Sequence, residues 1–339
     1  MLMGNYKRGI KRSIKRIKEE LKATKEIAHV LTYKQAFITL IGKLDIQIMV
    51  HNGRKEYKWI KKCLLRKHNI MNEFFNKKFN GFIPNIEQNE EDKNLKETTN
   101  IWICWWQGTE NMPKIVRECV ESIKYNSGEK NVIIITEKNY KNYIKFPNWI
   151  EEKYKKGIIS KTHLSDILRL ELLAKYGGIW LDSTFYCTGN LEKYFTLPVW
   201  TIKRPDYRHT SVACGAFANY SFGCNYESRY VFSIIKEYLY KYWEMYDYII
   251  DYLFLDYIIV YVINHNKNVK QKFEEIKPNN PKCDELLKII NKEYNEEIFK
   301  DLIKDTDLFK LSWKCSNHKK IKGENTFYDM LIDNENRDY

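Results

Sequence analysis

The 339-residue chain contains no run of about 18 consecutive apolar residues, the length that indicates a transmembrane helix. It has only 14 Gly and 7 Pro, which excludes collagen-like proteins and Pro/Gly-rich linker proteins. Apolar residues make up 44% of the chain and aromatic residues 15%, so a wholly disordered protein is excluded as well. At roughly 150 residues per domain, we expect one large domain or two ordinary ones.

Signals for zinc binding and for secretion are also missing. The eight Cys are scattered without a Cys-x-x-Cys pair, and the seven His do not cluster with them, so no zinc site is expected. The sequence begins Met1-Leu-Met-Gly-Asn-Tyr-Lys-Arg and continues into further basic residues, not into an apolar segment with a cleavage site. We therefore expect reduced thiols and a cytoplasmic protein.

The positive charge is confined to one part of the chain. The net charge is +13, and residues 1–80 contain 20 Lys and Arg against 6 Asp and Glu, so they hold the whole excess. Residues 5–50 predict a helix in which apolar residues recur every three to four positions over Ile10–Leu21. Three interpretations are open: this stripe packs on the main domain, docks on anionic lipid, or accompanies nucleic-acid binding. No other segment resembles a nucleic-acid module, so no nucleic-acid partner is expected.

Changes in composition divide the chain into four parts. We expect a basic helical N-terminal region at 1–84, a polar linker at 85–99, a catalytic-type domain at 100–315 and a polar C-terminal tail at 316–339.

The third part has the pattern of an α/β fold. Strands are predicted at Ile101–Trp106, Val132–Thr136 and Ile179–Asp182, with helices at Pro113–Lys124 and Thr162–Tyr176 between them. This alternation is typical of a parallel sheet with helices on its faces. Further strands are expected at 200–203, 212–218 and 308–313, and further helices at 57–79, 228–242, 246–264, 283–293 and 295–305.

Candidate site residues lie around the third strand. Asp166 and Arg169 are three positions apart on one helix face, and Asp182 ends the strand that follows. Ligands of open α/β sheets bind beyond the carboxyl ends of the strands. Asp182, followed by the hydroxyls of Ser183 and Thr184, therefore suits a metal–diphosphate, and Arg169 suits phosphate or sugar. The alternative is that Asp166 and Arg169 form a surface ion pair and that Asp182 caps a turn.

This segment resembles a known family. Ser165-Asp166-x-x-Arg169, followed by Tyr176-Gly177-Gly178-x-x-Leu181-Asp182, is similar to the sugar-nucleotide signature of glycosyltransferase family 32, above all its bacterial capsular polysaccharide branch. The large clostridial glucosylating toxins have a similar segment. Weaker similarity extends over 101–313 and includes 101–107, 113–116, Asp251–Tyr257 and Leu311–Lys314.

The resemblance implies a GT-A (Rossmann-like) domain that transfers a hexose from a UDP-sugar to a glycan acceptor with retention of anomeric configuration. The acceptor would be a lipid-linked capsular or surface polysaccharide intermediate. Asp182 would bind Mn²⁺ or Mg²⁺, although Thr184 replaces the second Asp of the family's Asp-x-Asp element and Ser312 is left to assist through water.

The same resemblance implies roles for other residues. Asp182, Asp166, Arg169 and Asp256 are the catalytic candidates, and Asp256 would hold or polarise the acceptor hydroxyl. The residues implied to bind the donor are Trp105, Trp106, Gln107, Asp166, Arg169, Gly178, Asp182, Thr184, Ser312 and Trp313. For the Trp residues, stacking on the ligand and packing in the core both remain open.

Other functions remain open at this stage. They are a sugar-nucleotide hydrolase, a transferase that glycosylates protein, and a catalytically impaired sugar-nucleotide-binding or scaffold protein. A lipid-linked acceptor and the basic residues 1–80 lead us to expect a peripheral position on the inner face of the cell membrane, through an anionic membrane surface.

Overall fold

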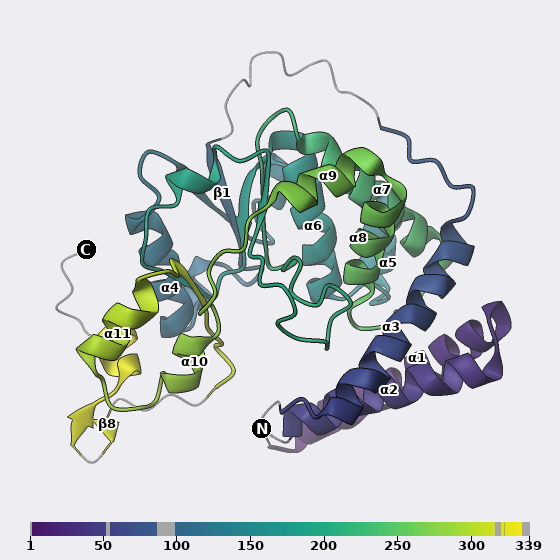
Figure 1. Cartoon of the computed structure of the whole chain (residues 1–339), viewed down its shortest axis with the longest axis horizontal. Helices are drawn as coiled ribbons and strands as arrows, with labels where there is room; N and C mark the ends of the chain where they lie inside the picture. Colours follow the sequence, from purple (N-terminus) through teal and green to yellow (C-terminus); the bar gives the residue numbers. More distant parts are fainter. Residues whose placement is uncertain (1, 52–54, 87–98, 316–319, 322, 334–339) are drawn as a thin grey trace.

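The computed structural model describes residues 2–51, 55–86, 99–315, 320–321 and 323–333, with side chains in the first helix described from residue 16. Figure 1 shows a sheet covered by helices and, at lower right, a long helical hairpin that extends away from it.

Five strands form the central sheet, in the order β2-β1-β3-β6-β5. They are β1 (Asn100–Cys104), β2 (Asn131–Ile135), β3 (Gly178–Leu181), β5 (Val199–Thr201) and β6 (Ser221–Cys224). Strand β1 is parallel to β2 and β3, and β6 is antiparallel to β3 and β5. The sheet is thus mostly parallel, which confirms the predicted α/β class and agrees with a GT-A-type domain.

Helices cover both faces of this sheet. Ile101 and Ile103 of β1 pack in the hydrophobic cluster with α4 (Lys114–Tyr125), whereas Trp102 packs in the cluster with α6 (Lys161–Tyr176). Successive residues of a strand point to opposite faces, so this alternation is expected. The α6 side is extended by α7 (Arg229–Met245), α8 (Phe254–His265) and α9 (Lys267–Glu275).

The remaining elements are short. The helices are α5 (Asn148–Lys155), α10 (Glu285–Ile289) and α11 (Glu296–Ile303), and the strands are β4 (Phe185–Cys187), β7 (Leu308–Lys310), β8 (Lys320–Ile321) and β9 (Glu324–Asn325). Single 3₁₀ turns occur at Thr109–Asn111, Tyr140–Asn142 and Glu192–Tyr194, and a π-helical turn at Asp329–Asp333. Strands β4 and β7 pair antiparallel in a separate two-stranded sheet.

The single helix predicted at 5–50 is in fact two helices, α1 (Leu2–Val30) and α2 (Tyr33–His51). The break is stabilised at Thr32, whose hydroxyl donates to Gln35 Oε1 at 2.9 Å and accepts from the Gln35 amide at 3.2 Å. A Ser or Thr followed three residues later by Glu or Gln is a capping box, which marks a helix N-terminus. Sequence analysis missed this signal.

Helix α3 (Lys58–Phe79) is part of the main body. Phe74, Phe75 and Phe79 are buried in the cluster that contains α7 and α8. Its buried Lys67 ammonium lies 2.7 Å from a carboxylate oxygen of the equally buried Asp251, just before α8. Residues 57–79 are therefore a helix as predicted, but one that packs on the catalytic-type region.

Three expected elements differ from the structure. Residues 212–218 lie in turns, and the sheet instead takes its antiparallel strand from 221–224. Helix α8 begins at Phe254, so residues 246–253 precede it as a loop. The expected polar tail contains Phe327, Leu331 and Ile332, which are buried in the cluster under α4. In the part of the chain that is described, no helix is both long and apolar enough to cross a membrane.

The ion pair between Lys67 and Asp251 gives a stability prediction. Asp251→Asn leaves a buried ammonium without its counter-charge, and losing one partner of a buried pair typically costs about 3–5 kcal/mol. We expect a loss of that size in the free energy of unfolding, measured by urea denaturation.

The matched control is Asp247→Asn, the same chemical change at an ion pair with Lys153 in which the Asp side chain is 64% exposed. Exposed pairs contribute up to about 1 kcal/mol, so this variant should unfold nearly as the wild type does. Equal losses for the two variants would show that the buried pair has no special role.

Candidate active site

The carboxyl ends of β1 and β3 open onto a groove of about 470 Å³. Its walls are residues 104–107, the first turns of α6, Trp180 with residues 182–184, Tyr252 and residues 310–314. Eight of the ten residues expected to bind the donor line it, namely Trp105, Trp106, Gln107, Arg169, Asp182, Thr184, Ser312 and Trp313. Segments far apart in sequence thus meet where ligands of open α/β sheets bind.

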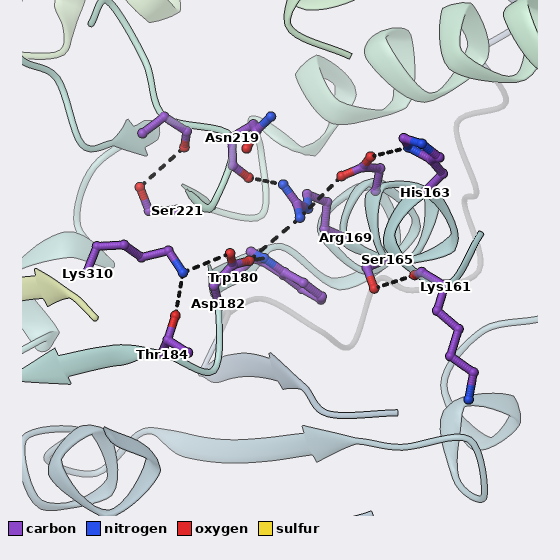
Figure 2. Close-up of polar contacts among 12 residues, drawn as sticks. Lys161, His163, Ser165, Arg169, Trp180, Asp182, Thr184, Asn219, Ser221 and Lys310 are labelled. Atoms are coloured by element: carbon purple, nitrogen blue, oxygen red, sulfur yellow. Dashed lines mark hydrogen bonds and ion pairs between the residues drawn. The ribbon is translucent and has the colours of Figure 1, made fainter. Parts of the chain in front are cut away.

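Asp182 is the centre of the polar contacts in this groove (Figure 2). Its Oδ1 accepts from Trp180 Nε1 at 3.2 Å and lies 3.6 Å from Arg169 Nη2, and its Oδ2 lies 3.2 Å from Lys310 Nζ. Burial raises the pKa of Asp182, but the charges of Lys310 and Arg169 outweigh burial and lower it. The carboxylate is therefore ionised and bridges two cations.

Arg169 is held from three sides. Its guanidinium donates to the Asn219 carbonyl, lies 3.3 Å from Asp166 Oδ1, and lies over the Trp180 ring with Cζ 5.2 Å from the centroid. The side chain is only 7% exposed, and its Nε has no hydrogen-bond partner among the described residues. One donor of this buried cation, which lines the groove, is thus unsatisfied by the described residues.

Asp166 contacts Arg169 as the spacing predicted, but it does not line the groove. Its other oxygen lies 3.3 Å from His163 Nδ1, in the first turn of α6. In this position Asp166 orients the guanidinium, because a fixed carboxylate restricts where the cation can lie.

The three Trp residues differ in exposure. Trp106 is buried, and its Nε1 donates to Ser165 Oγ at 2.7 Å, which fixes the ring. Trp105 is buried as well and meets Trp313 edge-to-face, with centroids 5.7 Å apart. Trp313 is 45% exposed, so its ring is the most accessible of the three for stacking on a ligand.

Gly178 is the second expected donor-binding residue, after Asp166, that does not line the groove. It begins β3, at the opposite end from Asp182, and does not line the groove. Its φ is +84°, and a Cβ would lie 2.3 Å from the Asn100 carbonyl oxygen. Glycine is therefore required by the close approach of β1 and β3, and the structure does not bring Gly178 into the groove with the other residues expected to bind the donor.

Lys310 lines the groove and contacts Asp182, although the sequence analysis did not single it out. It ends β7, and besides Asp182 its ammonium contacts Thr184, donating to Oγ1 at 2.5 Å. The similarity at Leu311–Lys314 stopped one residue short of it. Only the pairing of β7 with β4 shows that this lysine lies beside Thr184.

The side chains around Asp182 do not fit a divalent cation. Asp182 is the single carboxylate among the described lining residues, and no group of three His, Cys, Asp or Glu among the described residues could hold a metal. Mg²⁺ and Mn²⁺ favour oxygen ligands, whereas both Asp182 oxygens already contact nitrogen donors. An ion there would also be repelled by Arg169 and Lys310. The expected Mn²⁺ or Mg²⁺ stays a prediction, and no step below depends on it.

A second hollow of about 350 Å³ adjoins the groove and shares Lys310, Leu311 and Ser312 with it. Asp256, on the first turn of α8, lines this hollow. Its Oδ2 accepts from Ser211 Oγ at 2.5 Å and its Oδ1 from Asn219 Nδ2 at 2.7 Å. Because the Asn219 carbonyl also accepts from Arg169, Asp256 is linked to the groove through one residue.

Three acids around the start of α8 lie in different surroundings. Asp251 is buried against Lys67, and Asp247 pairs with Lys153 on the surface, both in the loop before α8. Of these three, Asp256 lines the hollow.

Burial raises the pKa of Asp256 to about 6. In the folded state the group therefore stays protonated at pH values where it is ionised in the unfolded chain. Stability from this group is present at about pH 4 and is lost as the pH rises through about 6.

Asp256→Asn should remove this dependence, since the amide can accept from Asn219 and donate to Ser211. A shift of about two pKa units corresponds to about 3 kcal/mol. Between pH 4 and 7, the free energy of unfolding of the variant should therefore rise by up to that amount relative to that of the wild type. Urea denaturation at both pH values measures the difference. A constant difference would contradict the buried, ionisable position of Asp256.

Comparison with known proteins identifies the family of the chain. The family of capsular polysaccharide synthesis proteins matches residues 52–331, which includes α3 and the buried C-terminal residues outside the resemblance seen in sequence. No curated protein matches. A solved structure titled "PaToxG Glycosyltransferase" is similar at 15% identity and a TM-score of 0.35, over 63% of this chain and 81% of that one. No step here depends on that similarity, and membership of glycosyltransferase family 32 stays a prediction. The family match covers most of the chain, which therefore belongs to the capsular polysaccharide synthesis protein family.

Proposed function

We propose that the protein is a glycosyltransferase that moves a hexose from a UDP-sugar to a glycan acceptor, with retention of configuration. The family supports glycosyl transfer in polysaccharide synthesis. The observation that carries the proposal is the groove at the carboxyl ends of β1 and β3, in which Arg169 and Lys310 flank Asp182 beside an exposed aromatic ring.

The two cations suit a leaving diphosphate. When the bond from the anomeric carbon to the diphosphate breaks, negative charge grows on UDP, and cations already in position stabilise it without reorganising. Arg169 lines the groove from α6, and Lys310 reaches it from β7. Trp313 would stack on uracil, a type of contact worth roughly 1–3 kcal/mol per base.

The acceptor would occupy the adjoining hollow. Asp256 is linked through Asn219 to Arg169, which places an acidic group beside the donor groove. In our proposal Asp256 holds the acceptor hydroxyl, and the hydroxyl attacks from the face that UDP leaves, which retains configuration. A pKa near 6 means that Asp256 is mostly ionised at neutral pH and can accept a hydrogen bond from that hydroxyl.

Asp182→Asn tests this assignment. The variant keeps the size of the side chain but removes the charge that holds Arg169 and Lys310 in place. We expect UDP release from a panel of UDP-hexoses to fall by about 100-fold or more, the scale seen when a preorganised electrostatic group is lost. Release is measured in a coupled assay, and thermal unfolding verifies that the variant is folded.

Asp247→Asn, the same change outside the groove, should keep normal turnover. Turnover of Asp182→Asn close to that of the wild type would refute the assignment. Binding of UDP without turnover of any UDP-hexose by the wild type would instead favour the binding or scaffold interpretation.

We further propose that α1 and α2 bind an anionic membrane surface, which would bring the site to a lipid-linked acceptor at the inner face of the cell membrane. The exposed apolar residues of α2 recur at helical spacing on one face, and they are Tyr33, Phe37, Ile41, Leu44 and Ile48. Ile17 and Leu21 of α1 are exposed too. Leu21 lines a hollow with Phe37, and Ile17 lines another with Leu44, so the stripe spans both helices.

Basic side chains accompany this apolar stripe. On α1 the exposed ones are Arg16, Lys18, Lys22 and Lys25. Interfacial helices bind in this way: their apolar side chains enter the boundary of the bilayer, and their basic residues lie at the lipid headgroups. Of the open interpretations, packing of the Ile10–Leu21 stripe on the domain does not fit Ile17 and Leu21, which are 61% and 64% exposed. The side chains of Ile10 and Ile14 lie outside the described residues.

The double substitution Phe37→Glu with Leu44→Glu tests the membrane proposal. Removal of residues 1–80 would not, because it would delete α3 from the core. Burying one such side chain contributes about 1.5–3 kcal/mol, so the double variant should bind phosphatidylserine vesicles at least tenfold more weakly. Vesicle co-sedimentation at low and high salt measures this.

Ile298→Glu is the control, because Ile298 is a 49% exposed apolar residue on α11, at the other end of the molecule (Figure 1). It should bind vesicles like the wild type. Failure of the wild type to bind anionic vesicles at any salt concentration would overturn the proposal.

A further inference from the structure

We propose that the Lys310 ammonium takes the role that a divalent cation has in related chemistry, so that the diphosphate of the donor is bound and leaves without a metal. The inference rests on the proposed function, since the ligand is the diphosphate of a UDP-sugar. It follows from where the fold places Lys310.

The backbone fixes the position of this lysine. Lys310 is the register partner of Phe185 in the antiparallel β4–β7 pair. The next residue, Leu311, donates its amide to the Thr184 carbonyl at 2.9 Å. Lys310 is therefore held beside the segment that follows Asp182. Thr184 of this segment stands at the position of the second Asp in the Asp-x-Asp element named in the sequence analysis.

The ammonium lies where it can bridge protein and ligand. Nζ is 3.2 Å from Asp182 Oδ2 and 2.5 Å from Thr184 Oγ1. The rings of Phe185 and Tyr220 have centroids 5.5 and 5.6 Å from it. An ammonium has three N–H donors, so two contacts to the protein leave one for a phosphate oxygen. The side chain is 21% exposed and lines the groove, which gives that donor access to a ligand.

The presence of Thr184 in place of an acidic residue affects the net charge of the groove. A carboxylate at this position would neutralise Lys310, whereas the Thr184 hydroxyl accepts a hydrogen bond and leaves the charge in place. Asp182 is then the single carboxylate among the described lining residues, against four basic ones, of which Arg169 and Lys310 contact it. The same substitution that weakens a metal site thus keeps positive charge for the diphosphate.

The glycosyl transfer that Lys310 assists requires no metal ion in this proposal. The bond between the anomeric carbon and the diphosphate oxygen breaks, and its electron pair stays on UDP. The acceptor oxygen forms the new bond to the anomeric carbon, and its proton passes to the departing diphosphate. Lys310 and Arg169 stabilise the charge on UDP before that proton arrives.

The test measures UDP binding by calorimetry in EDTA and in Mn²⁺. The wild type should bind UDP with similar affinity in both. Lys310→Met should bind UDP in EDTA about tenfold or more weakly, because a charge-assisted contact is lost. Lys270→Met, the same change on the surface of α9, should bind as the wild type does. In Lys310→Met combined with Thr184→Asp, which restores the two acids, Mn²⁺ should strengthen UDP binding.

The outcomes separate the two proposals. Binding of UDP to the wild type only in Mn²⁺, or unchanged binding by folded Lys310→Met in EDTA, would overturn the role of Lys310 and leave the proposed function standing. Absence of UDP binding in both conditions would overturn the proposed function and this inference with it.

Discussion

The candidate site depends on the charge of Asp182. This carboxylate follows β3 and holds Arg169 from α6 on one oxygen and Lys310 from β7 on the other. Without that negative charge, the guanidinium and the ammonium would repel each other in a partly buried groove, where a Coulomb interaction is stronger than in water. One ionised side chain therefore holds the ends of three elements, β3, α6 and β7, together around the groove.

Asn219 transmits this arrangement to the second hollow. Its carbonyl accepts from Arg169 and its amide donates to Asp256, so one residue contacts both the donor groove and the adjoining hollow. Arg169 and Asp256 are then positioned by one residue, through its backbone carbonyl and its side-chain amide respectively. A catalytic geometry of this kind tolerates little displacement, because transfer needs both reacting groups aligned.

Sequence predicted the parts of this site whose signals are local. Asp166, Arg169 and Asp182 lie within one helix and the strand after it, and the structure brings Arg169 and Asp182 to one groove as expected. The long helices α3, α6 and α7 were also predicted, because apolar periodicity over many residues is a strong signal. These features were predictable because each depends on residues that are close together in the sequence.

Contacts between distant segments were not predictable. Lys310 meets Asp182 only because two three-residue strands pair, and runs that short have no distinctive pattern. The strand expected at 212–218 is apolar and small-residue-rich, yet the sheet uses 221–224. In the sequence Lys67 is one more basic residue of a charged region, and nothing in the local pattern predicts its burial against Asp251. Pairing and burial are tertiary properties, which composition does not encode.

The loop before α8 joins the N-terminal helices to the site. Lys43 of α2 donates to the Ile250 carbonyl at 2.8 Å, and the Tyr246 hydroxyl donates to Glu26 of α1 at 2.9 Å. Tyr252, in the same loop, lines the donor groove. Docking of α1 and α2 on a membrane would thus act on a segment that forms one wall of the site. The buried pair of Lys67 and Asp251 holds this loop to α3, so the surface that would face the lipid and the groove that would bind the donor are fixed to the same eight residues of chain, 246–253.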